Sequence, residues 1–162
     1  MLIKTLLNRF RRDTRGAALV EFAISLPLVL LLFAAIIEGG RMVWAYQAAS
    51  AGVRDAARYL ARVAPRDICT SGASISSYGG SLMGIVKNDL AGQTLFPTSM
   101  TVNSVTPSLN CVTGSYRNGA AIAQVSANIS ITMPFAGVFG FAGQSLPTVT
   151  ATITDQSRIY GS

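Results

Sequence analysis

Residues that could carry out chemistry are scarce in this chain of 162 residues, which contains no histidine. The lack of histidine removes Ser-His and Cys-His nucleophilic catalysis and most transition-metal sites. After Pro65 the acidic residues are Asp67, Asp89 and Asp155, which are widely spaced. Distant carboxylates can still form a dyad, so an anchored hydrolase is an alternative. We predict that the chain is not an enzyme and has no catalytic residue, cofactor or metal.

Glu21 is the most unusual residue, because it lies inside an apolar run over residues 17–37. A carboxylate within such a run is costly to place in a membrane and is a functional candidate for that reason. The alternative is that Glu21 lies near the membrane surface and interacts with the positive end of the helix dipole.

Charge is concentrated in a short leader before this run. Residues 1–16 contain five basic side chains and one acidic side chain, while the whole chain has a net charge of +6. Basic residues directly before an apolar segment hold a terminus in the cytoplasm. No pattern of interleaved aromatic and basic residues accompanies them, so we expect no nucleic-acid partner.

The apolar run is long enough to cross a bilayer, which requires about 20 residues in a helix. A removable signal peptide is the alternative. Its apolar region would be about 7–15 residues long and would end in a small-residue cleavage site. Here the run ends at Ile37 and is followed by Glu38-Gly39-Gly40-Arg41. We therefore predict a retained membrane span.

Helical periodicity continues beyond the span, so that residues 17–64 are predicted to form one long helix. Small and apolar residues recur at spacings of three and four and would form one stripe. This stripe packs either on the chain's own globular part or on neighbouring subunits. Its members are Met42, Ala45, Ala49, Gly52, Ala56, Tyr59 and Val63, and Arg54, Arg58 and Arg62 lie on another side.

Two cysteines, Cys69 and Cys111, follow the span on the side that would be translocated. Exported domains fold in oxidising compartments, where paired cysteines form disulfides. A bridge would close a loop of about 40 residues and stabilise the domain by about 4 kcal/mol on the loop-entropy model. We predict a structural disulfide.

From residue 65 onward the sequence predicts a small domain of mixed structure. A short helix is expected over residues 76–90, followed by an apolar loop over 134–147 between the last two of three strand-like runs. A β-bulge is expected in the middle run, where the apolar face switches register at Ile122. The predicted fold is α+β, with the outer half of the long helix packed on an antiparallel sheet. The strand runs are Ser99–Thr106, Ala120–Thr132 and Thr148–Ser157.

The stretch Arg15-Gly16-Ala17-Ala18-Leu19-Val20-Glu21-Phe22 resembles the prepilin-peptidase recognition site of type IV pilin-like proteins. Glycine offers no side chain to obstruct a membrane protease. With Ser25-Leu26-Pro27, Glu38-Gly39-Gly40-Arg41, Tyr46-Gln47-Ala48 and Arg54-Asp55-Ala56-Ala57-Arg58-Tyr59, the region resembles the TadE-like family of tight-adherence pilus systems. TadF-like proteins are a close alternative.

This resemblance implies a minor pilin or pseudopilin needed for assembly of a tight-adherence pilus. It implies cleavage by a prepilin peptidase between Gly16 and Ala17, and a role for Glu21 and Phe22 in assembly with other pilin-like subunits. The implied location is the bacterial inner membrane, with one span, a cytoplasmic N-terminus and an exported C-terminal domain. The three regions are residues 1–16, 17–64 and 65–162. The alternative function is a membrane-tethered adhesin or binding module that enters no pilus.

Overall fold

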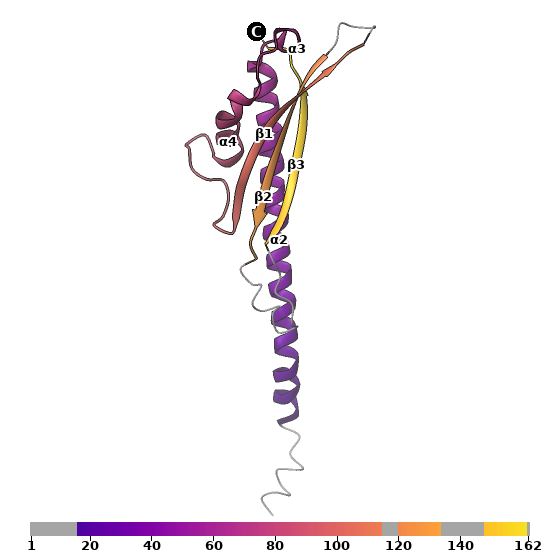
Figure 1. Ribbon diagram of the computed structural model, residues 1–162. Coiled ribbons are helices and arrows are strands. Elements are labelled where there is room, and N and C mark those ends of the chain that lie inside the picture. The colour runs from indigo at the N-terminus through magenta and orange to yellow at the C-terminus, as the bar shows by residue number, and fades with distance from the viewer. Residues whose placement is uncertain (1–15, 115–119, 134–147, 162) are drawn as a thin grey trace, which may run out of the picture.

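The computed structural model describes residues 16–114, 120–133 and 148–161. The basic leader and the predicted apolar loop therefore lie outside the described residues, apart from Gly16. The described elements are a long helix, two short helical segments and three strands, with a 3-10 turn between the short segments (Figure 1). Their bounds are α2 Ala17–Val63, α3 Ile68–Ser71, the 3-10 turn η2 Ser76–Tyr78, α4 Gly79–Lys87, β1 Met100–Val112, β2 Ala120–Ile131 and β3 Val149–Arg158.

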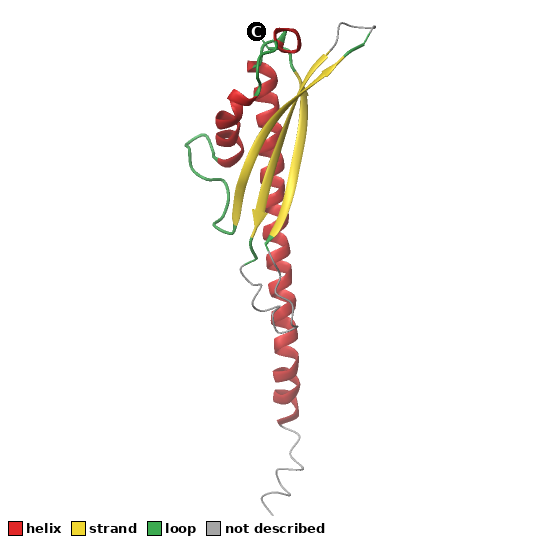
Figure 2. Ribbon diagram, in the orientation of Figure 1, coloured by secondary structure: helices red, strands yellow, loops and turns green. Residues whose placement is uncertain are grey.

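Helix α2 is one continuous rod of 47 residues, which corresponds to about 70 Å at 1.5 Å per residue. It continues through Pro27 and through Gly39 and Gly40. Its first half extends beyond the rest of the described molecule, and its second half lies behind the sheet (Figure 2). The predicted α+β architecture, a long helix whose outer half packs on a small antiparallel sheet, is confirmed.

The three strands form an antiparallel sheet in the order β1-β2-β3. One face packs against α2, and α4 packs against both α2 and β1. Burial along β2 alternates strictly, so its core face consists of residues at every second position. The core therefore forms between this face of the sheet and the helices. Its largest fully buried side chains are Leu60, Ile68, Leu82, Ile129, Val53, Val86 and Val125.

The opposite face of the sheet carries uncharged polar side chains that bond across the strands. Asn103 Nδ2 donates to Asn128 Oδ1 at 2.7 Å, and Asn128 Nδ2 donates to Thr152 Oγ1 at 3.3 Å. Gln156 Nε2 donates to Gln124 Oε1 at 2.7 Å. These cross-strand pairs support the register that the buried face also requires.

The predicted bulge is wrong in its position. The irregularity in register lies in β1, between Val102 and Ser104, and β2 is regular. Ile122 appeared to belong to the core because it is strongly apolar, but the core face at this end of β2 is formed by Ala121 and Ala123. The core face at this end of β2 therefore carries small side chains, and Ile122 is half-buried on the opposite face.

Two other predicted boundaries also differ from the structure. Strand β1 continues to Val112, six residues past the predicted end, and includes Pro107. A proline without an N–H group is tolerated there because β1 is an edge strand. The helix predicted over residues 76–90 is shorter, because α4 ends at Lys87 and a turn follows. Gly92 in this turn has φ +79°, a conformation that favours glycine.

The predicted stripe on α2 packs on the chain's own core except at Tyr59. Ala45, Ala49 and Ala56 are buried as expected, but Tyr59 is 39% exposed and the core instead takes Leu60. Spacings that alternate between three and four have a period of 3.5 residues, whereas a straight α-helix has 3.6. The predicted stripe therefore rotates away from the buried face of the helix by about 20° for every seven residues.

Candidate functional site

Gly16 directly precedes the first residue of α2, and nothing in the described fold requires a glycine there. Its φ of −82° and ψ of −15° are right-handed helical values that any residue adopts. A Cβ atom added at Gly16 would have no other atom within 4 Å, leaving aside its chain neighbours and the nearby helix backbone. A requirement for glycine at this position must therefore come from something outside the fold.

Glu21 is an exposed carboxylate on the apolar half of α2, one helical turn after Ala17. Four residues of α-helix correspond to a rise of about 6 Å. The first turn of α2 contains no acidic residue, and the stabilising effect of the helix dipole is largely limited to that turn. Interaction with the dipole is therefore a weak reason for a carboxylate at Glu21.

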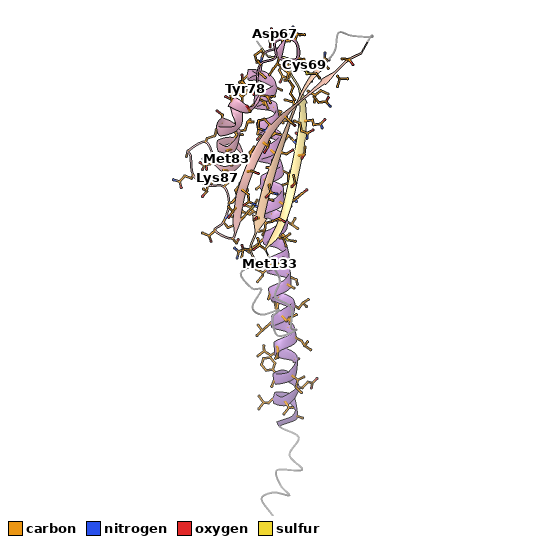
Figure 3. All side chains as sticks on the ribbon, viewed as in Figure 1. Asp67, Cys69, Tyr78, Met83, Lys87 and Met133 are labelled. Atoms are coloured by element: carbon orange, nitrogen blue, oxygen red, sulfur yellow. A yellow bond between two sulfur atoms is a disulfide. The ribbon has the colours of Figure 1, made fainter. Side chains whose placement is uncertain are left out.

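The surface around Glu21 is apolar and uncovered by the rest of the described chain. The most hydrophobic window of α2 has a mean hydropathy of 2.6, and none of it is buried. Neighbouring side chains are exposed, including Phe22 at 60%. Figure 3 shows side chains projecting from both sides of this half of the helix. By length and composition α2 is able to cross a membrane.

Pro27 lies within this apolar half and removes one backbone hydrogen bond from the helix. Two residues earlier, the Ser25 hydroxyl donates to the carbonyl oxygen of Phe22 at 3.2 Å. Such a serine satisfies its own polar group within the helix, as a lipid-exposed segment requires.

The two cysteines lie at the opposite end of the molecule from Gly16 and Glu21. A disulfide joins Cys69 on α3 to Cys111 near the end of β1, and the Cα atoms are 5.9 Å apart. Cys69 is labelled at the far end of α2 in Figure 3. The bridge ties the segment that follows α2 to the edge of the sheet. The structure therefore separates the predicted site residues into an apolar end and a disulfide-bonded end.

The sequence did not single out Glu38 as a site, yet it is the one buried polar or charged residue in the described structure. Glu38 is 7% exposed, and its Oε2 atom has no hydrogen-bond partner among the described residues. Its position at the end of the apolar run was the signal available in the sequence, since an acidic residue there is unusual.

The widely spaced aspartates do not come together in the structure. Asp67 precedes α3, Asp155 lies on β3, and Asp89 lies in the turn after α4. A groove between α2 and α4 contains Asp89 together with Asp55, which sequence reasoning had not paired. Among the described residues no group of three or more His, Cys, Asp or Glu side chains could hold a metal ion.

Residues 16–58 match the family model described as TadE-like protein. The match covers about a quarter of the chain and begins at Gly16. It includes the apolar half of α2 and most of the half that packs on the sheet. Neither a curated protein nor a solved structure matches the chain.

Proposed function

We propose that this chain, whose N-terminal region is TadE-like, is a minor pilin or pseudopilin that a prepilin peptidase cleaves between Gly16 and Ala17. The family match supports a pilin-like role associated with a tight-adherence pilus. The proposal assigns residues 1–16 to a leader, 17–64 to a membrane-spanning and extended helix, and 65–162 to an exported domain.

The observation that carries the proposal is the uncovered apolar half of α2 with a carboxylate in it. An apolar helix of this length is stable in a membrane or against other apolar helices, and not in water. Within the span, Glu21 requires a positively charged partner to offset its desolvation. Cleavage after Gly16 would create such a partner, because Ala17 would then carry a free α-amino group.

We assign this pair to two neighbouring subunits, with Glu21 on one subunit and the amino group on the other. The two groups on one helix are separated by a turn of backbone, and both face outward where other subunits pack. When the amine of one subunit meets Glu21 of the next, two charges are neutralised in an apolar environment. Opposite charges attract more strongly there than in water. Phe22, beside Glu21, supplies apolar contact area to the same neighbour.

We infer the orientation from the basic leader and the cysteines. Basic residues before the span favour a cytoplasmic N-terminus. The disulfide between Cys69 and Cys111 is of the kind that persists in oxidising compartments, which supports export of the domain. The chain would then have one span in the bacterial inner membrane.

Processing is tested by sequencing the N-terminus of the full chain recovered from membranes. We expect the mature chain to begin at Ala17. Gly16→Ala, or deletion of the prepilin peptidase, should leave the leader attached. Gly39→Ala is the matched control, since an added Cβ there also meets nothing in the described fold and cleavage should be unchanged. A mature chain that begins at Met1 would exclude the proposed processing.

A further inference from the structure

A groove of about 850 Å³ lies between α2, α4 and the turn that follows α4. Its α2 and α4 walls are formed largely by residues with little or no side chain, including Ala48, Ala51, Gly52 and Gly84. Asp55 and Asp89 are the charged residues among those that line it. The groove therefore combines walls of small residues with two carboxylates and no basic residue in its lining, a combination that suits a cationic side chain on a closely packed partner.

Contacts within the chain determine the shape of the groove. A Cβ atom at Gly52 would lie 3.1 Å from the Val86 Cα and carbonyl oxygen, so glycine there sets the close approach of α4 to α2. Asp89 Oδ1 accepts hydrogen bonds from the backbone N–H groups of Ala91 at 2.9 Å and Gln93 at 2.8 Å. These bonds fix the turn that forms the rim of the groove.

Helix α2 also carries a stripe of arginines, whose positive charge is opposite to that of the two aspartates in the groove. Arg54, Arg58 and Arg62 are all exposed, on a side of α2 turned away from its buried core residues. Residues four apart lie above one another on a helix, about 5–6 Å apart between Cβ atoms. The three guanidinium groups therefore form a row along the helix axis. Guanidinium groups suit carboxylate partners because they can bond them in a bidentate way.

We propose that the arginine stripe of one copy of this chain docks in the groove of a second copy. This inference rests on the proposed function, because insertion of both α2 helices in one membrane holds the copies parallel. The α2 wall of the groove is centred six to seven residues before the centre of the arginine stripe. Docking therefore displaces one copy along the other by about 10 Å.

This displacement has the same direction as the one needed to bring Glu21 of one copy to the Ala17 amine of a second copy. The copy that supplies its arginines is the one nearer the cytoplasm, and the copy that supplies its groove is shifted outward. Pairing of Glu21 of the inner copy with the Ala17 amine of the outer copy requires an outward shift of about 6 Å. The two shifts differ by about 4 Å, less than the length of an arginine side chain. One arrangement thus satisfies both contacts.

This contact uses different surfaces on the two copies, so it is heterologous. Contacts of this kind repeat along a line or helix and do not close into a two-fold dimer. In a docked pair, the inner copy still has a free groove and the outer copy still has a free stripe. The contact is therefore able to add copies one after another along a single axis.

The proposal is tested by crosslinking two differently tagged copies of the full chain in native membranes. Ala51→Cys in one copy and Tyr59→Cys in the other should crosslink, because a shift of about 10 Å brings these positions to within about 2 Å of the same height. Ala51→Cys in both copies is the matched control and should give little product, since it requires no shift. The native cysteines are already paired in the disulfide.

Charge exchange supplies the second measurement. Asp55→Arg in both copies, or Arg58→Glu in both copies, should lower the yield of the 51–59 crosslink by about fivefold or more, because like charges then meet in the groove. The yield should be restored when Asp55→Arg is placed in the copy with the Ala51→Cys substitution and Arg58→Glu in the copy with the Tyr59→Cys substitution. Arg158→Glu, on β3, is the control and should leave the yield unchanged.

The outcomes separate this inference from the proposed function. If the mature chain begins at Ala17 but the 51–59 crosslink is missing, or forms only with a different protein, the groove contact is wrong and the processing proposal stands. If the crosslink forms and is restored by charge exchange while the chain begins at Met1, the groove contact stands and the processing proposal is wrong.

Discussion

Gly16 and Glu21 have in common that the described fold explains neither of them. Gly16 has ordinary helical backbone angles and open space where a side chain would be. Glu21 contributes nothing to the core and lies among exposed apolar side chains. Residues of this kind are explained by contacts made outside the chain. The proposed proteolysis before α2 and the proposed pairing between subunits would account for both.

Replacing Glu21 by Gln should reduce assembly and leave processing intact. The variant keeps the side-chain shape and removes the charge that would neutralise the Ala17 amine of a neighbour. An unpaired charge within a membrane costs about 2.5–3.5 kcal/mol, so recruitment into fibres should fall by about tenfold or more. The measurement is the amount of this chain in sheared fibres relative to membranes.

Glu21→Asp serves as the control because it keeps the negative charge, and it should retain most of the assembly. N-terminal sequencing of Glu21→Gln should still give Ala17 as the first residue. Unchanged fibre production and complex formation in Glu21→Gln would show that the charge pairing is not needed.

The apolar end of the site could be predicted from sequence because its residues are neighbours in the chain. Gly16, Ala17 and Glu21 lie within two turns of one helix, so their spacing fixes their geometry. The groove could not be predicted in this way. Asp55 and Asp89 come together only when α4 packs on α2, and that approach depends on the contact between Gly52 and Val86.

At the scale of elements, the sequence predicts the types of secondary structure better than the faces that they bury. Helix and strands were expected from periodicity, and their order was correct. Ile122 was placed on the apolar face of its strand and Tyr59 on the helical stripe by its spacing, and the structure leaves Ile122 half-buried and Tyr59 exposed. In each case a smaller or better-aligned neighbour takes the buried position, Ala121 and Ala123 on β2 and Leu60 on α2.

This difference in burial along β2 can be measured with two identical substitutions. Ile129→Ala should lower the free energy of unfolding by about 2–5 kcal/mol, because Ile129 is fully buried against the helices. Ile122→Ala, on the other face of the same strand, should lower it by less than about 1 kcal/mol. Denaturant unfolding of the purified full chain in detergent gives both values. Equal losses would show that the register of β2 is different.

The end of α2 is closed by the segment that follows β3. The Tyr160 N–H donates to the Ala61 carbonyl oxygen at 3.1 Å, and a Cβ atom at Gly161 would be only 2.5 Å from the Arg62 carbonyl oxygen. The Ala64 carbonyl oxygen would be in close contact as well. A side chain at Gly161 therefore has to move the backbone on one side of this contact.

Gly161→Ala should consequently destabilise the domain by about 1–3 kcal/mol. Gly80→Ala is the control, because a Cβ atom there meets nothing and alanine favours the helix α4 by up to about 1 kcal/mol. Thermal unfolding followed by circular dichroism compares the two variants. A midpoint for Gly161→Ala equal to that of the unsubstituted chain would mean that the segment after β3 does not hold the helix end.

At the scale of the whole molecule, one helix is shared between two environments. Its first half has the composition of a membrane span, and its second half forms the core of the domain. Because α2 is continuous, the domain is held at a fixed position along the helix axis. The continuous helix would therefore make the proposed contacts at Glu21 and in the groove depend on one common displacement between copies.

The orientation of the whole chain is tested by labelling from outside. Ser77→Cys places a single free thiol on the exposed 3-10 turn η2, outside the groove, while the native cysteines stay paired. A membrane-impermeant maleimide should label it in intact spheroplasts as fully as after lysis. Labelling that appears only after lysis would place the domain in the cytoplasm and contradict the proposed orientation.

Strand β3 follows all of its packing partners in the sequence, and this has a consequence for biosynthesis. A ribosome completes α2 first, whereas Ile153 and Ile159, both part of the core, emerge only after the other described helices and strands. Until then β2 lacks one of its two neighbouring strands and part of the buried surface of α2 remains uncovered. The long helix is therefore available for membrane insertion while the rest of the polypeptide is still incompletely folded.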